Sequence, residues 1–512
     1  MSGQPNFLVI CTDQQRSDSL GCAGNRQAST AHIDSIARNG TLFRRHSTPM
    51  QICSPSRATM LSGLYPRHHG LVVNGMALPG KVPVVTDTLA AAGYRTHAVG
   101  KMHLEPLLAP PEYRTPDPRA FWSLPESDGW NGPHYGYQTL DLLLGESDTA
   151  HLAGHYANWL RENHPDSVPL LLPASAPEPP PADLDEIWRS AIPAEHHYNT
   201  WITDRAVSFI GQASTASAPF FLFVSYPDPH HPFDPPAEYA DRFDPAGMPV
   251  PRVSVEERGR QLPYFRELYP EGAGFRELYW SARTDLEGGS MITTDRISDE
   301  SLGRAIAYTH ATIRMIDDQV GRLLETLDRA GLADSTVILF TSDHGELLGD
   351  HGLLHKGPPP YRQLTEVACL MKGPGIPVGA VVDAMTSHID LAPTLLDLAG
   401  VQGKGHDFDG TSMTPLLGDG VSALREFDFG EYHPTARTDL YNQTVRTAGW
   451  RLTLYPGHPE WGELFDLAED PAERLNRYGE PGTATVTSEL RDVLEKRFPP
   501  CPGVDNEWIC KW

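Results

Sequence analysis

Residues 51–63 have the sequence Gln51-Ile52-Cys53-Ser54-Pro55-Ser56-Arg57-Ala58-Thr59-Met60-Leu61-Ser62-Gly63, and the rest of the chain is best understood from them outward. Ser54 is a suitable N-cap and Pro55 a suitable first helical residue, so we expect a short helix directly after Cys53. A helix N-terminus favours bound anions, and Arg57, one turn further on, is within reach of Cys53. The segment predicts a cysteine beside an anion site; a buried, inert cysteine is the alternative.

Apolar runs elsewhere in the chain have the length and composition of buried strands. Continuous apolar runs are typical of strands covered on both faces, as in a parallel sheet. Helical spacing of apolar residues over 302–330 and a helical segment at 86–92 supply the covering layers. These segments predict an α/β fold. The predicted strands are Asn6–Thr12, Arg95–Gly100, Ala218–Tyr226 and Ser335–Ser342.

Polar side chains follow each of these predicted strands. The carboxyl ends of parallel strands meet at one edge of a sheet, where α/β proteins bind ligands, so these side chains are expected to converge. Taken singly, each has a structural alternative, such as a helix cap, a surface pair or a loop histidine. The residues are Asp13 and Gln14 after the first strand, Lys101 and His103 after the second, His230 after the third, and Asp343 and His344 after the fourth.

Several of these strings resemble signatures of the type I sulfatases, a branch of the alkaline phosphatase superfamily that includes arylsulfatases and phosphonate monoester hydrolases. Cys53-Ser54-Pro55-Ser56-Arg57 resembles the Cys-x-Pro-x-Arg signature of that family. The later strings occur in the family's order, so the resemblance covers nearly the whole chain. They are Gly100-Lys101-Met102-His103-Leu104, Pro229-His230-His231-Pro232 and Asp343-His344.

The resemblance implies the architecture of the whole chain. We expect a large mixed, mostly parallel sheet sandwiched by helices, as in alkaline phosphatase, over residues 1–424. Short predicted strands from residue 427 onward and a helix at 489–496 indicate a small C-terminal α+β subdomain, an antiparallel sheet with a helix and an extended tail, over residues 425–512.

The resemblance also implies a modified nucleophile and a metal. In this family the cysteine corresponding to Cys53 is oxidised to formylglycine, whose hydrate attacks the ester. One divalent cation is expected, bound by Asp13, Gln14, residue 53, Asp343 and His344. Gln14 stands where most relatives have a second aspartate, so the site loses one negative charge. The ligand types suit either Ca²⁺ or Mn²⁺.

The remaining roles are likewise implied by the resemblance. Arg57, Lys101 and Lys356 would supply positive charge to the ester oxygens. His230, with Lys356, would protonate the leaving oxygen, and His103 would be the base that acts on the second hydroxyl of the hydrate. Asn74 resembles the asparagine near the ester, although a turn asparagine is its local alternative.

The resemblance leaves three functions open. Hydrolysis of sulfate monoesters, of the arylsulfatase type, fits the Lys101 and His103 pair. Hydrolysis of phosphonate monoesters or phosphodiesters, with promiscuous sulfatase activity, fits Gln14 at the first metal position. A non-catalytic binding protein on the same fold is the third, should Cys53 stay unmodified.

Composition limits the partners. The formal net charge of −25 disfavours nucleic acid and anionic lipid, so an anion site has to be locally positive. No stretch of about 18 apolar residues predicts a membrane span, and the N-terminus shows no export signal, so we expect a cytoplasmic protein.

The six cysteines form no disulfide scaffold. The expected partners are a small anionic ester, a formylglycine-generating maturation enzyme and further copies of the chain in a homo-oligomer.

Overall fold

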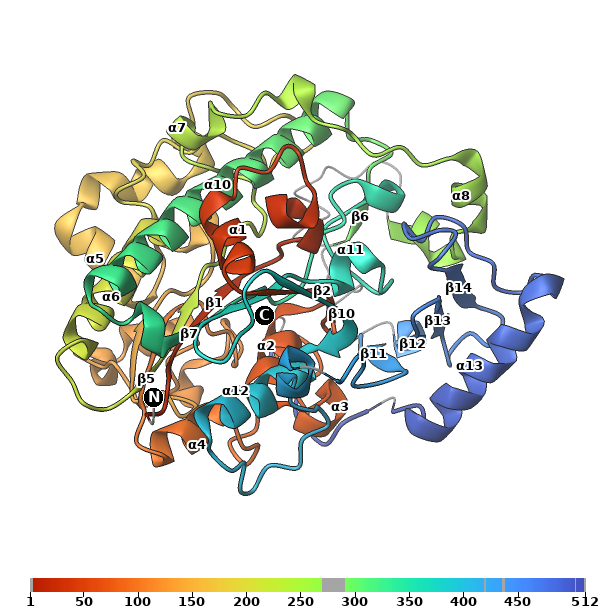
Figure 1. Ribbon diagram of the computed structural model, residues 1–512. Helices are drawn as coiled ribbons and strands as arrows, with labels where there is room; N and C mark the ends of the chain where they lie inside the picture. The colour runs from red at the N-terminus through yellow and green to blue at the C-terminus, as the bar shows by residue number, and fades with distance from the viewer. Residues whose placement is uncertain (1–2, 269–290, 419, 435–437, 502, 511–512) are drawn as a thin grey trace.

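The structure is a computed structural model that describes residues 3–268, 291–418, 420–434, 438–501 and 503–510. Its centre is an eight-stranded sheet between two layers of helices (Figure 1). No helix within the described ranges is long and apolar enough to cross a membrane. The strand order is β10 (Ala380–Ser387), β2 (Thr41–Ser47), β9 (Cys369–Lys372), β7 (Thr336–Ser342), β1 (Asn6–Thr12), β5 (Phe220–Ser225), β3 (Arg95–Gly100) and β4 (Thr139–Leu142).

The sheet is mixed but mostly parallel, as the sequence predicts. β1 lies at its centre and pairs in parallel with β7 on one side and β5 on the other. β9 runs antiparallel to both of its neighbours, β2 and β7, and the remaining pairs are parallel. The strand ends that carry the predicted site residues therefore lie along one edge.

Alternate residues of β1 enter two separate cores because successive side chains of a strand point to opposite faces. Phe7 and Val9 pack with residues of α2, α4 and α12, whereas Leu8 and Ile10 pack with residues of α1, α5, α6 and α10. Figure 1 shows these helix layers on opposite sides of the sheet. The α-helices of the described residues, in these layers and elsewhere, are α1 (Ala31–Arg38), α2 (Cys53–Ser62), α3 (Pro66–His69), α4 (Val85–Ala91), α5 (Gly154–Asn163), α6 (Tyr198–Ala213), α7 (Ala237–Ala240), α8 (Val255–Arg260), α10 (Asp299–Arg329), α11 (Arg362–Thr365), α12 (Leu391–Ala399) and α13 (Ala484–Arg497).

A separate four-stranded antiparallel sheet with α13 on it forms the C-terminal region (Figure 1), and this prediction is confirmed. Its strands, in order, are β11 (Asp428–Tyr432), β12 (Asn442–Arg446), β13 (Trp450–Leu454) and β14 (Gly462–Asp466). The tail after α13 returns to the main body, where Ile509 N–H donates to the carbonyl of Gly75 at 2.8 Å.

Four strands of the large sheet were not among the predicted ones: β2, β4, β9 and β10. β4 and β9 have four residues each, and β2 carries Arg44, Arg45 and His46, so none shows the long apolar run that identifies a buried strand. The predicted irregular region 250–300 contains α8 and β6 (Ile292–Thr293), and its residues 269–290 lie outside the described part. β6 pairs with β8 (Leu353–Leu354) in a two-stranded sheet.

Candidate active site

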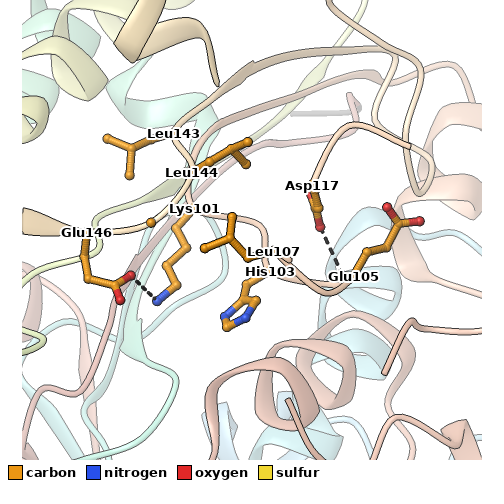
Figure 2. Close-up of a pocket in the computed structure, with 9 residues that line it drawn as sticks. Lys101, His103, Glu105, Leu107, Asp117, Leu143, Leu144 and Glu146 are labelled. Carbon is orange, nitrogen blue, oxygen red and sulfur yellow. Dashed lines mark hydrogen bonds and ion pairs between the residues drawn. The ribbon is translucent and has the colours of Figure 1, made fainter. Parts of the chain in front are cut away.

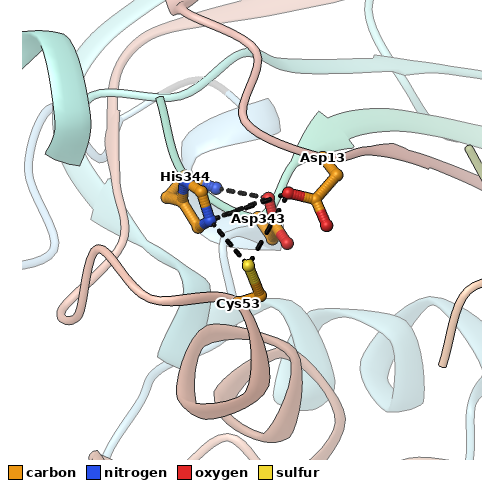
Figure 3. A group of neighbouring side chains, drawn as sticks. All are labelled: Asp13, Cys53, Asp343 and His344. Carbon is orange, nitrogen blue, oxygen red and sulfur yellow. Dashed lines mark hydrogen bonds and ion pairs between the residues drawn. The ribbon is translucent and has the colours of Figure 1, made fainter. Parts of the chain in front are cut away.

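Four predicted site residues meet at the carboxyl edge of the sheet, although they come from three distant segments (Figure 3). Asp13 follows β1, Asp343 and His344 follow β7, and Cys53 is carried by α2. Cys53 Sγ lies 3.1 Å from His344 Nε2 and 3.7 Å from Asp13 Oδ1. Potential ligand atoms of all four residues lie within 4.8 Å of one another, and all four are buried. The expected convergence is therefore present.

The start of α2 differs from the expectation. The helix begins at Cys53 itself, Ile52 is its N-cap, and Ser54 and Pro55 are the second and third helical residues. Ser54 does not cap; its backbone N–H instead donates to Asn74 Oδ1 at 3.1 Å. The capping prediction was wrong because Asn74, which is distant in sequence, supplies the acceptor that a local cap normally provides. Asn74 thus fixes the turn that carries Cys53.

Arg57 joins the two metal-type carboxylates. Its Nε donates to Asp343 Oδ2 at 2.9 Å and its Nη2 to Asp13 Oδ2 at 3.1 Å. Burial alone would raise the pKa of Asp13, but the charges of Lys101 and Arg57 hold that pKa well below its usual value. Asp13 is consequently a carboxylate at neutral pH.

Lys101 and His103 line one pocket after β3 (Figure 2). Lys101 Nζ lies 2.8 Å from Asp13 Oδ2 and 3.1 Å from Glu146 Oε2. Burial opposes its charge, yet these two carboxylates raise the pKa of Lys101 above its usual value. Burial and the charge of Lys101 keep the pKa of His103 well below the ordinary value, so its imidazole is neutral and able to accept a proton.

Lys356 and His230 form the opposite side of the site. Lys356 Nζ lies 3.2 Å from Cys53 Sγ, 2.9 Å from His230 Nε2 and 2.6 Å from Gln14 Oε1. Burial, followed by the charge of Lys356, lowers the pKa of His230 well below its ordinary value. Because Lys356 Nζ contacts both groups, the amide oxygen of Gln14 and the thiol of Cys53 lie close together.

The donor set fits a divalent cation. Asp13 and Asp343 supply carboxylate oxygens, and His344 Nε2 lies 3.7 Å from an oxygen of each. Burial lowers the pKa of His344 to about 4, so its imidazole is neutral at pH 7 and free to coordinate. Carboxylate, amide and imidazole ligands suit hard or borderline ions, in keeping with Ca²⁺ or Mn²⁺.

The thiol of Cys53 is poorly suited to act as a nucleophile itself. Its side chain is 1% exposed, and burial raises its pKa to about 12, with the charge of Asp13 adding to the effect. Because the thiolate is the reactive form of cysteine, this raised pKa disfavours the unmodified thiol as a nucleophile in the metal-free protein.

Two carboxylates of the site were not predicted. Glu146 contacts Lys101 and lies 3.9 Å from His230 Nδ1, but it follows the short strand β4, which gives little signal in the sequence. Glu346 accepts from the Gln14 amide and from the backbone N–H of Leu348, at 2.9 Å for Leu348. Its place three residues after Asp343 at the end of β7 was the available signal.

Comparison with known proteins identifies the family. The sequence profile "Sulfatase" matches residues 5–401, and the profile "N-sulphoglucosamine sulphohydrolase, C-terminal" matches residues 349–498. The chain therefore belongs to the sulfatase family, within the alkaline phosphatase superfamily, and is a sulfuric ester hydrolase.

Relatives match over nearly their whole length. An arylsulfatase of Clostridium perfringens is 27% identical over 97% of this chain and 94% of its own. The multifunctional alkaline phosphatase superfamily protein PehA of Trinickia caryophylli is 28% identical over 96% and 94%. Among solved structures, the phosphonate monoester hydrolase of Agrobacterium radiobacter superimposes with a TM-score of 0.76 at 26% identity, covering 96% of this chain and 95% of that one.

Proposed function

We propose that the protein hydrolyses sulfate monoesters of the arylsulfatase type, with formylglycine derived from Cys53 as the nucleophile and one divalent cation. The observation that carries this proposal is the position of Cys53 Sγ, 3.1 Å from His344 Nε2 and 3.2 Å from Lys356 Nζ. A nucleophile there is within reach of both a proposed metal ligand and a proton donor.

The cation would be held by Asp13, Gln14, Asp343 and His344, together with residue 53. When bound, it would lower the pKa of the nucleophilic hydroxyl and draw charge from the ester oxygens. Arg57, which is 2% exposed, is tied to Asp13 and Asp343 and keeps these two carboxylates in place.

The residues opposite the cation would act on the ester and its leaving group. Lys356 and His230, in contact at 2.9 Å, are placed to hold the bridging oxygen and give it a proton as the alcohol departs. Lys101 would bind a non-bridging ester oxygen. His103, neutral in this setting, would accept the proton whose loss releases sulfate and restores the aldehyde.

A second candidate activity is hydrolysis of phosphonate monoesters or phosphodiesters. It is favoured by Gln14, whose amide stands where a second carboxylate would add negative charge, and by the similarity to the Agrobacterium phosphonate monoester hydrolase. We expect the sulfate ester to be preferred and the phosphonate ester to be turned over more slowly.

Peptide mass analysis and paired kinetics test the proposal. The peptide that contains Cys53 should have the mass of the aldehyde or its hydrate, and aryl sulfate should be hydrolysed faster than the matched aryl phosphonate. Cys53→Ala should abolish turnover, whereas Cys22→Ala, at a cysteine outside the site, should not. Full turnover by Cys53→Ala would refute the nucleophile, and an unmodified peptide without turnover would favour the binding-protein alternative.

A further inference from the structure

A second group of metal-type side chains lies beside the active site and has no role in the proposed reaction. Glu186, His231 and His355 are buried, and each offers a ligand atom within 4.8 Å of those of the other two. His355 Nε2 lies 3.2 Å from Glu186 Oε2. The rings of His231 and His355 are perpendicular, with centroids 3.9 Å apart. The three groups thus surround one small space.

The backbone holds these three side chains from separate segments. Glu186 and His231 are fixed relative to each other because Phe233 N–H donates to the Glu186 carbonyl at 2.7 Å and Trp188 N–H to the Phe233 carbonyl at 3.2 Å. His355 follows β8 and has a left-handed backbone with φ of 66°. Its carbonyl accepts from Leu347 N–H at 3.2 Å, and its N–H donates to Glu346. A strained backbone held on both sides indicates a side chain that must point in one direction.

Apolar side chains make up part of the surroundings of the group, beside the polar contact between Gln14 and His231. Leu184, Ile187, Phe233 and Leu354, next to or near the three residues in sequence, belong to one buried hydrophobic cluster. In such surroundings a carboxylate interacts strongly with a nearby cation, since little water is present to weaken the attraction.

We propose that Glu186, His231 and His355 bind a divalent transition-metal ion of the Zn²⁺ class, at a second site distinct from the one around Cys53. Two imidazoles and one carboxylate form a ligand set that binds Zn²⁺ in proteins, with a fourth position left for water. The site at Cys53 is rich in oxygen ligands and suits harder ions. The two sites therefore select different cations.

The second site adjoins the first one without sharing its ligands. Gln14 Nε2 lies 2.9 Å from His231 Nδ1, and the Gln14 oxygen contacts Lys356. His231 directly follows His230, and His355 directly precedes Lys356. An ion bound by His231 and His355 would fix the two segments that carry His230 and Lys356, which makes the three ligands positioning residues. This inference does not depend on which ester is the substrate.

The test measures zinc in the full-length protein. The protein is equilibrated with buffered free Zn²⁺ and excess Ca²⁺, and bound zinc per chain is measured by mass spectrometry of the element. We expect about one zinc in the wild type and in Asp343→Asn, and a loss of most of it in Glu186→Gln and His355→Ala. His310→Ala, at a buried histidine elsewhere, should keep its zinc. Added Zn²⁺ should raise the Tm of the wild type and of Asp343→Asn but not that of Glu186→Gln.

Diffraction at the zinc absorption edge provides the second measurement. We expect a peak among Glu186, His231 and His355 in crystals of the zinc-loaded wild type. Zinc that is retained in Glu186→Gln and lost in Asp343→Asn, or a peak found only among Asp13, Asp343 and His344, would overturn the proposal. Glu186→Gln preserves the size of the side chain. Its zinc content therefore tests the proposal even if His355→Ala fails to fold.

Discussion

The side-chain nitrogen of Lys356 lies 3.2 Å from the sulfur of Cys53, although the two residues are 303 positions apart in the chain. An ammonium group has three donors, and here they face Cys53, His230 and Gln14. Lys356 thereby links the nucleophile position, the predicted leaving-group acid and a predicted metal ligand.

Replacing Lys356 with methionine should lower kcat by about 10²–10⁴-fold, because a proton donor and a positive charge are both removed. The loss should be larger for an alkyl sulfate than for a nitrophenyl sulfate, whose leaving group needs no proton. Steady-state rates on the two esters give this comparison, with Lys372→Met at the end of β9 as the control. Equal losses on both esters would contradict the acid role.

Replacing Arg57 with methionine should destabilise the metal-free protein by about 3–5 kcal/mol, because the buried carboxylate of Asp343 loses its arginine partner and that of Asp13 loses one of its two cationic partners, Lys101 remaining. A divalent cation should restore part of this stability by compensating the same carboxylates. Urea unfolding with a chelator and with Ca²⁺ or Mn²⁺ measures both effects. Arg44→Met is the control: Arg44 and Asp383 are 59% and 65% exposed, so the cost should be below about 1 kcal/mol. An Arg57→Met protein equally stable under both conditions would refute the coupling.

The ionisation of Glu431 should make the free energy of unfolding depend on pH. Although burial opposes it, hydrogen bonds from His433 and Arg67 lower the pKa of Glu431 to about 2. A carboxylate with a depressed pKa contributes stability above its unfolded pKa of about 4.5 and loses that contribution as the pH falls towards about 2. Glu431→Gln should therefore cost about 3 kcal/mol at pH 7, and the difference from the wild type should shrink below pH 4.5.

Urea unfolding at several pH values between 7 and 3 checks this dependence. Glu495→Gln, at an exposed position of α13, should show no comparable trend. A wild-type advantage that stayed constant down to pH 3 would mean that the Arg67 contact does not control the ionisation of Glu431.

Replacing Gly75 with alanine should release the C-terminal tail. Gly75 has a φ of +95°, and a Cβ there would lie 1.9 Å from the carbonyl oxygen of Cys510. We expect a loss of about 1–3 kcal/mol and faster proteolysis of the tail. KM should rise as well, because Asn74 is the neighbouring residue. Gly80→Ala, where a Cβ meets nothing within 4 Å, is the matched control. Unchanged proteolysis of Gly75→Ala would show that the tail is held by other contacts.

The sequence predicts the centre of the molecule better than its margins. The long apolar runs of β1, β3, β5 and β7 identify the inner strands and the residues that follow them, because complete burial leaves a continuous signal. Short or charged strands such as β4 and β2 lack that signal, and Glu146 was missed along with β4. The contact of the tail with Gly75 also has no local signal: Trp508 is 41% exposed, yet the neighbouring Ile509 N–H donates to the Gly75 carbonyl.

Contacts between distant segments explain the other differences. Ser54 is a good cap by local rules, yet Asn74 takes over the interaction. His231 directly follows His230 in the chain, and only the fold places it beside Glu186 and His355. Local patterns contain no information on such long-range partners.

The complete burial of α2 has a consequence for how the mature protein arises. Every residue from Cys53 to Ser62 is buried, and the sulfur lies beneath both the sheet edge and the side chain of Lys356. The active site of another enzyme cannot reach this helix unless the domain unfolds. The proposed conversion of Cys53 would therefore have to precede folding, on a nascent or still extended polypeptide, and a molecule that folds first would keep the thiol.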